Sequence, residues 1–462
     1  MLDLALIRAE PARVKASLAR RGVGAEVVDA VIDLDGRRSA RQEVLEALRV
    51  RRRRISDEVA RRRAALRTGP DWDADTFHAP DLVQAGREVA GQLHAVEAEM
   101  ADLAVRRDQA LLALPNLPMT DVPDDWPEPA AAPGAPPWRQ PFAPLAHWDL
   151  IEMLGLARTA GETAGRGFLV WRGQGARLVR ALVEWMLDVH TREGGCEEIR
   201  APSVATRAAL TGSAHLPLLE DKMYAVAPHA TDPATTSRDH PDPSRDHQDP
   251  SRDREGAVGA DHDLYLAPRA EPHLAGLYAG QVLDDAALPV RLVAAGNALR
   301  RESHGGGAAG RGLLRLHEFP TVELYTFCRP GQADAELERA VARAETILQR
   351  LGAAHRRRLR PAPHLSHAAA RTVDLDVWAP GTGRWLDVAA VSAFTDYQAR
   401  RTNTRCRDAQ GRTRLVHTVG GAAVAVPHLV AALLENGQQE DGAVRLPEAL
   451  AGAGGETILR HS

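Results

Sequence analysis

Charged and aromatic side chains at the ends of two expected strands could hold a nucleotide. Arg300 and Glu302 close an apolar stretch that begins at Leu292, and a glycine-rich segment separates them from Phe319 and Glu323. This pattern predicts a strand, a loop and an antiparallel strand. An inward guanidinium binds phosphate oxygens, and an aromatic ring stacks on a base. The arrangement therefore suits a reaction in which an α-phosphate is held during nucleophilic attack.

A second segment has the form expected for the other side of such a site. It reads HTVGGAAVAVPHLVAALLEN over 417–436, which predicts a strand of small residues followed by a helix. A second arginine at the start of this helix would suit the outer phosphates, but the chain has His428 there. Free imidazole has a pKa near about 6.5, so His428 supplies positive charge only when it is protonated.

Bulk composition limits the class of protein. A chain of 462 residues that is 44% hydrophobic is long enough for two domains and a large core. The three cysteines, Cys196, Cys328 and Cys406, lie far apart and lack metal-ligand spacing, so structural zinc is not expected. The same cysteine usage predicts a reducing, cytoplasmic compartment. No apolar run reaches transmembrane length and the first residues are too charged for a signal peptide, so no membrane association is expected.

Two long segments near the start of the chain carry the hydrophobic spacing of a coiled coil. We expect helices over roughly 29–68 and 80–113, separated by TGPDWDADTFHAP. Apolar residues recur at spacings of three, four and seven in these helices. They are Leu45, Leu48, Ile55, Val59 and Leu66 in the first helix and Val89, Leu93, Val96, Met100 and Leu103 in the second. The pair should fold back as an antiparallel hairpin.

The first of these helices carries four consecutive arginines, Arg51, Arg52, Arg53 and Arg54. Because the apolar seam holds the helices together, these guanidiniums are expected to face solvent. A projecting basic arm suits the phosphate backbone of a folded RNA, which rewards charge and shape over base identity. The alternative is an ordinary solvated helix face in an arginine-rich chain.

A proline-rich segment, 114–138, divides the chain. We predict an arm over 1–113, this linker, and a catalytic domain over 139–462. After an amphipathic helix in GARLVRALVEWMLDVHTREGG, strands are expected in EEIRAPSV, DLYLAP, PVRLVAAGNALRR, LLRLHEFPTVELYTFC, TVDLDVWAP and RLVHTVGG. Strands without regular helical crossovers favour an antiparallel sheet flanked by helices, so the predicted fold class is α+β.

The segment over 230–260 contains a seven-residue repeat, SRDHPDP followed by SRDHQDP and SRDRE. It is polar, carries proline and lacks apolar anchors, so we predict a disordered insertion. Its histidines and aspartates could mimic a metal cluster, but a flexible insertion explains the composition more simply.

Motifs spread over the whole length now identify a resemblance. The chain opens with MLDLALIRAEPARVKASLARRG, continues through the helical arm to LPNLP, and later carries DYQARRTNTRCR and LENGQQEDGAVRLPEAL. Together these resemble a bacterial-type seryl-tRNA synthetase, a class II aminoacyl-tRNA synthetase. The resemblance implies a homodimer, and a coiled-coil arm that grips the long extra arm of tRNA-Ser or a similar tRNA. It also implies ATP and Mg²⁺, and formation of an aminoacyl-adenylate from the amino acid before transfer to tRNA.

The resemblance also assigns roles to individual residues. Arg300 matches the catalytic arginine that binds the α-phosphate and the substrate carboxylate. Glu302 and Phe319 match the residues that recognise and stack on adenine. Glu271 stands where the family binds the substrate ammonium, and Glu323 where it meets the serine hydroxyl. All five are therefore expected in one active site.

At other positions the sequence departs from the family pattern. Arg269 replaces a threonine of the amino-acid pocket and could pair with an acidic substrate, with Glu271 or with Asp387. Asp387 shortens the glutamate on the ribose and metal side, so we expect it to bind ATP and Mg²⁺. Three residues after Asp387, Ala390 replaces a serine of the family, and Ala422 replaces a hydroxyl residue of the amino-acid pocket. His428 stands where the family has the catalytic arginine that binds the γ-phosphate.

Two hypotheses follow from these departures. In the first, the protein is a divergent ligase that activates serine or a related amino acid and transfers it to tRNA or another acceptor. In the second, it is a catalytically inactive paralogue that keeps tRNA binding in a regulatory or structural role. Loss of one charged contact to a transition state costs about 2.7–4 kcal/mol, so the departures bear directly on the activity.

Overall fold

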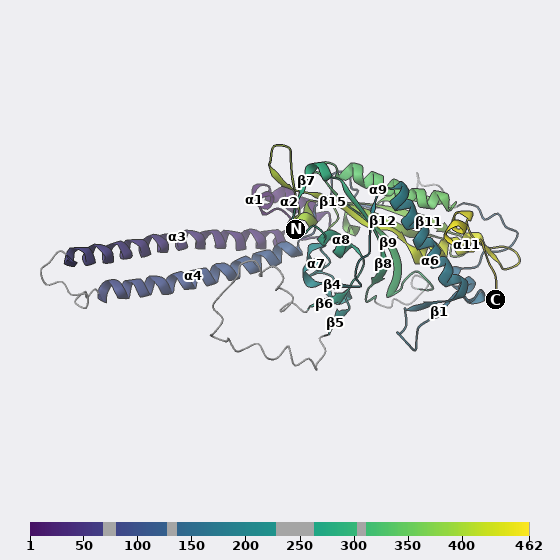
Figure 1. Cartoon of the computed structure of the whole chain (residues 1–462), viewed down its shortest axis with the longest axis horizontal. Coiled ribbons are helices and arrows are strands. Elements are labelled where there is room, and N and C mark those ends of the chain that lie inside the picture. Colours follow the sequence, from purple (N-terminus) through teal and green to yellow (C-terminus); the bar gives the residue numbers. More distant parts are fainter. Residues whose placement is uncertain (68–79, 127–135, 228–262, 303–310, 462) are drawn as a thin grey trace. The chain divides into compact units, whose positions relative to one another are not determined.

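The structure is a computed structural model that describes residues 1–67, 80–126, 136–227, 263–302 and 311–461 (Figure 1). It divides into two compact units, one of residues 2–115 and one of residue 1 with residues 116–462. The insertion predicted over 230–260 lies outside the described residues. No helix within the described ranges is both long and apolar enough to cross a membrane.

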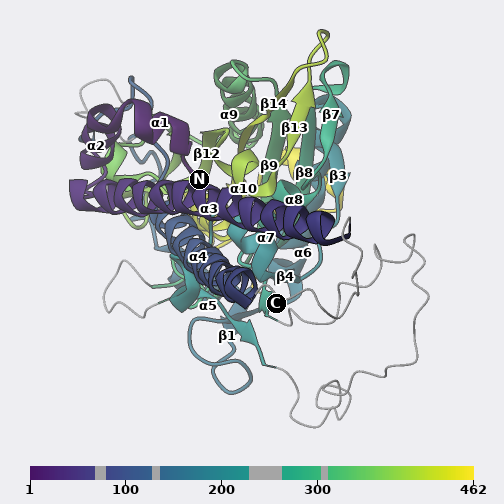
Figure 2. The same ribbon diagram turned by 90° about the vertical axis from the view of Figure 1, so that its left-hand side faces the viewer.

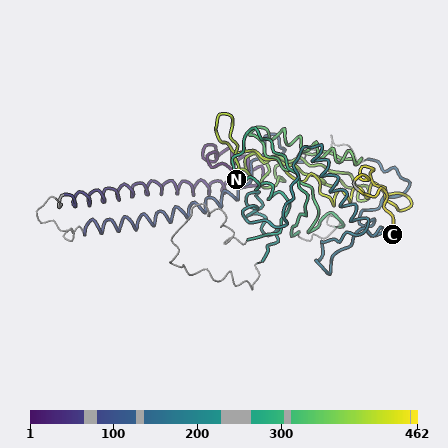
Figure 3. Tube along the Cα trace, in the orientation of Figure 1, coloured from purple at the N-terminus to yellow at the C-terminus, as the bar shows by residue number. Residues whose placement is uncertain are grey.

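The first unit is a helical hairpin with a small cap. Its helices are α1 Leu4–Ala9, α2 Pro11–Ala19, α3 Ala25–Arg67 and α4 Pro80–Ala113. The trace in Figure 3 shows α3 and α4 running antiparallel to each other. Leu45, Val89 and Leu93 are at most 5% exposed in the seam between them. Leu48, Ile55, Val96 and Met100 pack against these three side chains. The predicted antiparallel coiled coil is confirmed, with α3 beginning four residues earlier than expected.

Ion pairs between the two helices agree with this register. Arg41 contacts Glu99 at 2.9 Å, and Arg62 contacts Asp81 at 3.0 Å. Exposed pairs of this kind contribute roughly 0–1 kcal/mol each, whereas a buried leucine contributes about 1.5–3 kcal/mol. The apolar seam is therefore the main source of stability in the hairpin, and the ion pairs mostly select its alignment.

The second unit is built on a seven-stranded sheet in the order β10-β11-β12-β15-β9-β8-β3. All neighbours are antiparallel except β3 and β8, which are parallel. In that order the strands are His355–Leu359, Arg371–Ala379, Arg384–Thr395, His417–Ala425, Glu318–Cys328, Val290–Leu299 and Glu197–Ile199. Figure 2 shows β8 and β9 side by side. The α+β fold class is confirmed.

Three long helices share a hydrophobic core with this sheet: α6 Gly173–Asp188, α9 Ala333–Arg350 and α11 Val426–Gly437. Leu182, Val341 and Leu429, one from each helix, are fully buried in that core. The strands alternate, so their apolar residues point to the core and the intervening residues to the opposite face. That opposite face carries the polar side chains of the predicted site.

Shorter elements surround the sheet. The other helices are α5 His147–Met153, α7 Arg207–Gly212, α8 Glu271–Gly276 and α10 Tyr397–Thr402. The other strands are β1 Ala157–Thr159, β2 Leu169–Trp171, β4 Val204–Thr206, β5 Ala225–Val226, β6 Leu264–Leu266, β7 Val282–Asp284, β13 Arg405–Arg407, β14 Thr413–Leu415, β16 Val444–Arg445 and β17 Ile458–Leu459. A π-helical turn, Val189–Glu193, ends α6, so the helix expected over 175–195 changes its hydrogen bonding in its last turn.

Within the seven-stranded sheet, the sequence pattern missed two strands, β10 and β12. β10 reads HRRRL, and its arginines are compatible with a strand because Asp376 on β11 contacts Arg356 at 2.8 Å and Arg358 at 2.6 Å. β12 reads RWLDVAAVSAFT and contains several alanines, which have low strand propensity. It lies between two other strands, so tertiary pairing rather than local preference fixes its conformation.

Candidate active site

A cavity of about 370 Å³ lies where β8 and β9 meet the start of α11. Its lining residues are Arg300, Glu302, Leu313, Leu314, Arg315, Leu316, Phe319, Ala425, Pro427 and His428. Arg300 directly follows β8, whereas Phe319 lies on β9 opposite Ala298. Four residues expected at an ATP site (Arg300, Glu302, Phe319 and His428) therefore line one cavity.

Arg300 provides the cavity with positive charge. Among the described residues, no side chain or carbonyl oxygen accepts a hydrogen bond from its guanidinium. Burial, and then repulsion from Arg269, lower the pKa of Arg300 to about 10, so the group stays protonated at neutral pH. An unpaired, partly buried guanidinium is poorly compensated. A phosphate or carboxylate entering the cavity would supply the missing partner.

His428 also lines this cavity, and its ring contacts two backbone carbonyls. Its Nδ1 is 2.6 Å from the oxygen of Asp387, and its Nε2 is 3.1 Å from the oxygen of Leu314. A neutral imidazole has only one N–H, so only the protonated ring can donate to both. In this conformation the ring links β12 to the segment before β9. It would have to give up a carbonyl contact to donate to a phosphate.

The residues expected to bind the amino acid form a buried charge cluster. The Nε of Arg269 donates to Glu323 at 2.9 Å, and its Nη1 donates to Glu271 at 3.2 Å. The backbone N–H of Glu271 also donates to Glu323 at 2.8 Å. Arg269 thus pairs with Glu271, one of the partners expected for it, and with Glu323. Asp387, the other expected partner, contacts Arg360 at 3.5 Å instead.

Protonation equilibria in this cluster reflect opposing effects. Burial raises the pKa of Glu271, while the guanidinium of Arg269 opposes the rise. Burial also disfavours the charged form of Arg269, but attraction to Glu323 and Glu271 outweighs it and raises the pKa of Arg269. The glutamate side chains are only 7% and 1% exposed, so the arginine neutralises carboxylates that water can hardly reach.

Gln398 on α10 was not singled out from the sequence, although it lies within the DYQARR motif. Its Nε2 donates to Glu271 at 2.8 Å and to the carbonyl of Ser213 at 3.0 Å. Its Oε1 accepts from the hydroxyls of Tyr325 and Thr418 at 2.7 and 3.2 Å. The amide is fully buried with four partners, so it fixes the orientation of the Glu271 carboxylate.

Strand register brings the substituted positions together. Glu323 on β9 pairs with Ala422 on β15, which in turn pairs with Ala390 on β12. Directly opposed residues of neighbouring strands face the same side of a sheet, so two methyl groups lie in the row beside the Glu323 carboxylate. Gly421 has a φ of 148°, and a Cβ there would lie 2.1 Å from the oxygen of Ala390. The backbone at this row is therefore too close for a larger residue at 421.

Asp387 follows a different pattern from the residues that line the cavity. Its carboxylate lies 3.5 Å from Arg360, which also binds Asp374 at 2.6 Å. Burial and then repulsion from Asp374 raise the pKa of Asp387 to about 7. Water reaches 47% of its side-chain area, so we attribute the rise mainly to the neighbouring carboxylate. Within the described ranges, no group of three histidine, cysteine, aspartate or glutamate side chains is arranged to hold a metal ion.

Comparison with known proteins agrees with both the fold and the site. Residues 257–437 match the tRNA synthetase class II core domain of the G, H, P, S and T enzymes, and residues 1–118 match the seryl-tRNA synthetase N-terminal domain. The first match spans the described cavity residues and the charge cluster. It defines the class of protein as a class II aminoacyl-tRNA synthetase.

Full-length relatives narrow the class to a family. The chain is 37% identical to the serine–tRNA ligase of Gemmatimonas aurantiaca over 470 aligned residues, which cover 99% of this chain and 100% of the relative. It is 34% identical to that of Roseiflexus castenholzii, with both chains fully covered. The seryl-tRNA synthetase of Pyrococcus horikoshii complexed with ATP superposes with a TM-score of 0.82 at 28% identity, with both chains fully covered. The chain therefore belongs to the seryl-tRNA synthetase family.

Proposed function

We propose that this protein binds ATP in the 370 Å³ cavity, activates an amino acid as its adenylate, and transfers the acyl group to tRNA. The observation that carries the proposal is the Arg300 guanidinium, which faces the cavity without an acceptor among the described residues. The ATP complex of the similar Pyrococcus horikoshii enzyme supports ATP as the ligand. Full-length similarity to serine–tRNA ligases favours an enzyme over the inactive paralogue.

The reaction consists of two substitutions. A carboxylate oxygen of the amino acid attacks the α-phosphorus of ATP, and the bond to the leaving pyrophosphate breaks. A terminal ribose hydroxyl of tRNA then attacks the acyl carbon and AMP leaves. Arg300 would neutralise charge on the α-phosphate and orient the carboxylate, while Phe319 stacks on adenine and Glu302 accepts from its amino group. Such chemistry depends on positioning and charge stabilisation more than on acid–base groups.

Mg²⁺ is the expected counter-ion for the phosphates, and it would neutralise charge on the leaving pyrophosphate. Magnesium is commonly held by one or two carboxylates together with substrate phosphates and water. Asp387 suits that donor set, because its carboxylate is partly exposed and repelled by Asp374. His428 would contribute positive charge near the outer phosphates only when its ring carries both protons. Arg360 competes for the same carboxylate, which would limit metal affinity.

The amino-acid pocket would accept serine poorly. Glu271 would bind the substrate ammonium and Glu323 its hydroxyl, but both carboxylates are paired with Arg269. Ala390 and Ala422 offer no hydrogen bond to a substrate hydroxyl. Sites that hydrogen-bond a substrate discriminate strongly, whereas small apolar pockets discriminate weakly. We therefore propose serine or a related amino acid as the substrate, with low selectivity for the hydroxyl.

The arm is proposed to bind tRNA through Arg51–Arg54. All four residues are exposed, and no partner is found for them in the part of the chain that the structure describes. Nearby arginines of α3 differ, since Arg49 and Arg62 are paired with glutamate or aspartate side chains. Four free guanidiniums on an extended helix match the phosphate backbone of a folded RNA.

Reversing the four arginines to glutamate should lower tRNA affinity by about 100-fold at low salt and flatten its salt dependence. A gel shift with bulk tRNA at several salt concentrations measures both. Pyrophosphate exchange without tRNA should stay unchanged, which controls for folding of the second unit. Arg106→Glu, an exposed residue of α4 beside Asp102, is the matched control and should leave binding within a few-fold. Unchanged affinity in the quadruple variant would contradict the proposed role of the arm.

Homodimerisation and a cytoplasmic location complete the proposal. Helix α6 and β8 border a mainly apolar groove lined by Trp171, Val179, Val183 and Leu187 among others. An exposed apolar groove of this kind favours burial against another surface. All three cysteines are free thiols, which suits a reducing compartment. Light scattering at micromolar concentration tests the dimer directly, because a monomer would have half the expected mass.

A further inference from the structure

One wall of the proposed nucleotide cavity has no regular secondary structure of its own. Residues 311–316 precede β9, and Leu313, Leu314, Arg315 and Leu316 from this segment line the cavity. An irregular segment keeps a fixed shape only if neighbouring elements satisfy its backbone groups. The contacts of Leu313 and Leu314 therefore decide how well the wall is placed.

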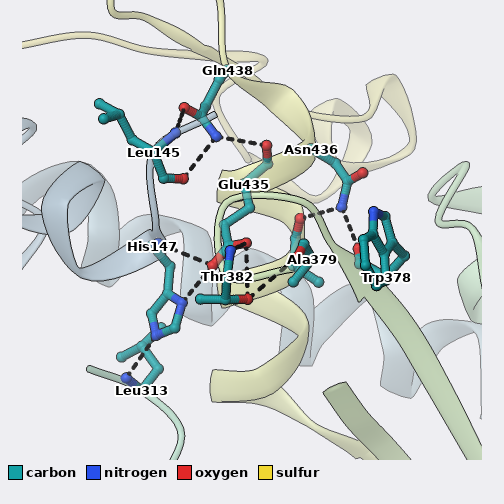
Figure 4. Close-up of polar contacts among 10 residues, drawn as sticks. Leu145, His147, Leu313, Trp378, Ala379, Thr382, Glu435, Asn436 and Gln438 are labelled. Atoms are coloured by element: carbon teal, nitrogen blue, oxygen red, sulfur yellow. Dashed lines mark hydrogen bonds and ion pairs between the residues drawn. The ribbon is translucent and has the colours of Figure 1, made fainter. Parts of the chain in front are cut away.

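The Leu313 contact leads to a buried, hydrogen-bonded pair of side chains (Figure 4). His147 on α5 and Glu435 on α11 are both fully buried, and the ring Nδ1 lies 2.7 Å from Oε1 of Glu435. The same oxygen accepts from the backbone N–H of His147 at 3.1 Å. The other oxygen accepts from the backbone N–H of Thr382 at 2.9 Å and from its hydroxyl at 3.3 Å. Four donors compensate this carboxylate, as a buried charge requires.

These contacts fix the tautomer of His147. Because a carboxylate only accepts, the proton of the neutral ring must lie on Nδ1. Nε2 then carries a lone pair, and the backbone N–H of Leu313 donates to it at 3.2 Å. In the opposite tautomer the proton would lie on Nε2, and this N–H would face the backbone N–H of Leu313 with no acceptor between them. Glu435 thus acts on the cavity wall through the imidazole, without touching the cavity.

The wall also packs directly on the same ring. Gly312 has a φ of 69°, and a Cβ at this position would lie 2.5 Å from Nε2 of His147. The guanidinium of Arg311 lies 5.0 Å above the ring of Trp148, the next residue of α5. Three consecutive residues of the wall therefore rest on the start of α5.

Helix α11, which carries Glu435, also contacts the wall at a second point. His428 and Glu435 are seven residues apart on α11, which is two helical turns and hence one face. Nε2 of the His428 ring lies 3.1 Å from the oxygen of Leu314, while Glu435 reaches the N–H of Leu313 through His147. One helix face thus secures both the acceptor and the donor of neighbouring wall residues.

We propose that Glu435 and His147 are positioning residues for ATP, and that they hold the 311–316 wall against the nucleotide through the Leu313 hydrogen bond. The ATP part of this inference rests on the proposed function. The role of the pair is distinct from that of Arg300, because neither side chain lines the cavity.

Two substitutions of His147 separate positioning from mere packing. Glutamine places an amide oxygen near Nε2 and keeps an acceptor for Leu313, whereas asparagine places an amide nitrogen near Nδ1 and keeps only the Glu435 contact. Asn436→Ala is the matched control, because Asn436 links α11 to the carbonyl of Trp378 and lies away from Leu313 (Figure 4). Gly312→Ala is a second test, since its Cβ would push the wall off the ring without altering the buried pair.

The readouts are KM for ATP and for the amino acid in pyrophosphate exchange, the dissociation constant of Mg·ATP by calorimetry, and amide hydrogen exchange of the Leu313 N–H without ligand. We expect His147→Asn and Gly312→Ala to raise KM for ATP about 5- to 10-fold with a smaller change in KM for the amino acid, as loss of one hydrogen bond implies. Leu313 exchange should accelerate in both. His147→Gln keeps the Leu313 acceptor but loses the Glu435 contact that orients it, so it should show a rise in KM for ATP clearly smaller than that of His147→Asn. Asn436→Ala should stay within about twofold of wild type in all readouts.

The results separate this inference from the proposed function. A wild-type protein without pyrophosphate exchange would count against the proposed function, while Mg·ATP binding and Leu313 protection in the variant series would still test the pair. Equal losses in the asparagine and glutamine variants would show packing rather than positioning. Wild-type ATP affinity and slow Leu313 exchange in both His147→Asn and Gly312→Ala would overturn the proposal.

Discussion

Replacing Arg300 with alanine should lower amino-acid-dependent pyrophosphate exchange by at least about 10²–10³-fold, the usual effect of removing one charged contact to a developing transition state. Arg300 is the cavity arginine without an acceptor in the described part of the chain, and its guanidinium retains its charge at neutral pH despite burial. Steady-state exchange at saturating ATP measures the effect, and calorimetric titration with Mg·ATP reports how much of it is ground-state binding.

Two neighbouring substitutions sharpen this prediction. Arg301 follows Arg300 in the chain, is exposed, and does not line the cavity. Arg301→Ala should therefore leave pyrophosphate exchange within a few-fold of the wild-type rate. Arg300→Lys keeps the charge but loses the planar fork that binds phosphate and carboxylate together, so an intermediate rate is expected. If the alanine variant kept a tenth or more of the wild-type rate, the cavity would not be the site of adenylate formation.

Replacing Arg269 with threonine should raise kcat/KM for serine in the exchange reaction by about 10- to 100-fold. The guanidinium now occupies the carboxylates of Glu271 and Glu323, so a substrate ammonium and hydroxyl must compete with two charged hydrogen bonds. Hydrogen bonds to charged groups contribute about 1.5–3 kcal/mol each, which sets the size of the gain. Without the arginine, the carboxylates of Glu271 and Glu323 become available to the ammonium and hydroxyl of the substrate.

The same change should weaken the free protein. Two carboxylates that are 7% and 1% exposed would lose their cation, and breaking a buried pair in this way commonly costs about 3–5 kcal/mol. Thermal unfolding should therefore begin at lower temperature in the threonine variant, and saturating serine should recover part of the loss. Arg269→Lys keeps a cation and should show no gain for serine. An unchanged kcat/KM in the threonine variant would mean that Arg269 is not what limits serine.

Local sequence patterns predicted much of the fold. The seam of α3 and α4 follows from apolar spacing alone, because a coiled coil is specified by its own heptads. Arg300 and Phe319 could be placed at one site because a single strand–loop–strand unit carries both. β10 and β12 could not be recognised, since arginine pairing with Asp376 and burial between strands determine them.

The finer geometry of the site depends on contacts between distant parts of the chain. Arg269 had several possible partners in the sequence, and only the packing of α8 against β9 selects Glu271 and Glu323. Gln398 lies 127 residues from Glu271 in the sequence, and His147 lies 288 residues from Glu435. No local spacing predicts such pairs, although the DYQARR and LENGQQ motifs contain two of these residues.

ATP–pyrophosphate exchange on the purified full-length protein, with each standard amino acid and Mg²⁺, tests the central claim most directly. Exchange that depends on serine or a related amino acid, and that is lost in Arg300→Ala, is the predicted result. No exchange with any amino acid, in protein that still binds Mg·ATP and tRNA, would contradict a ligase that forms an aminoacyl-adenylate.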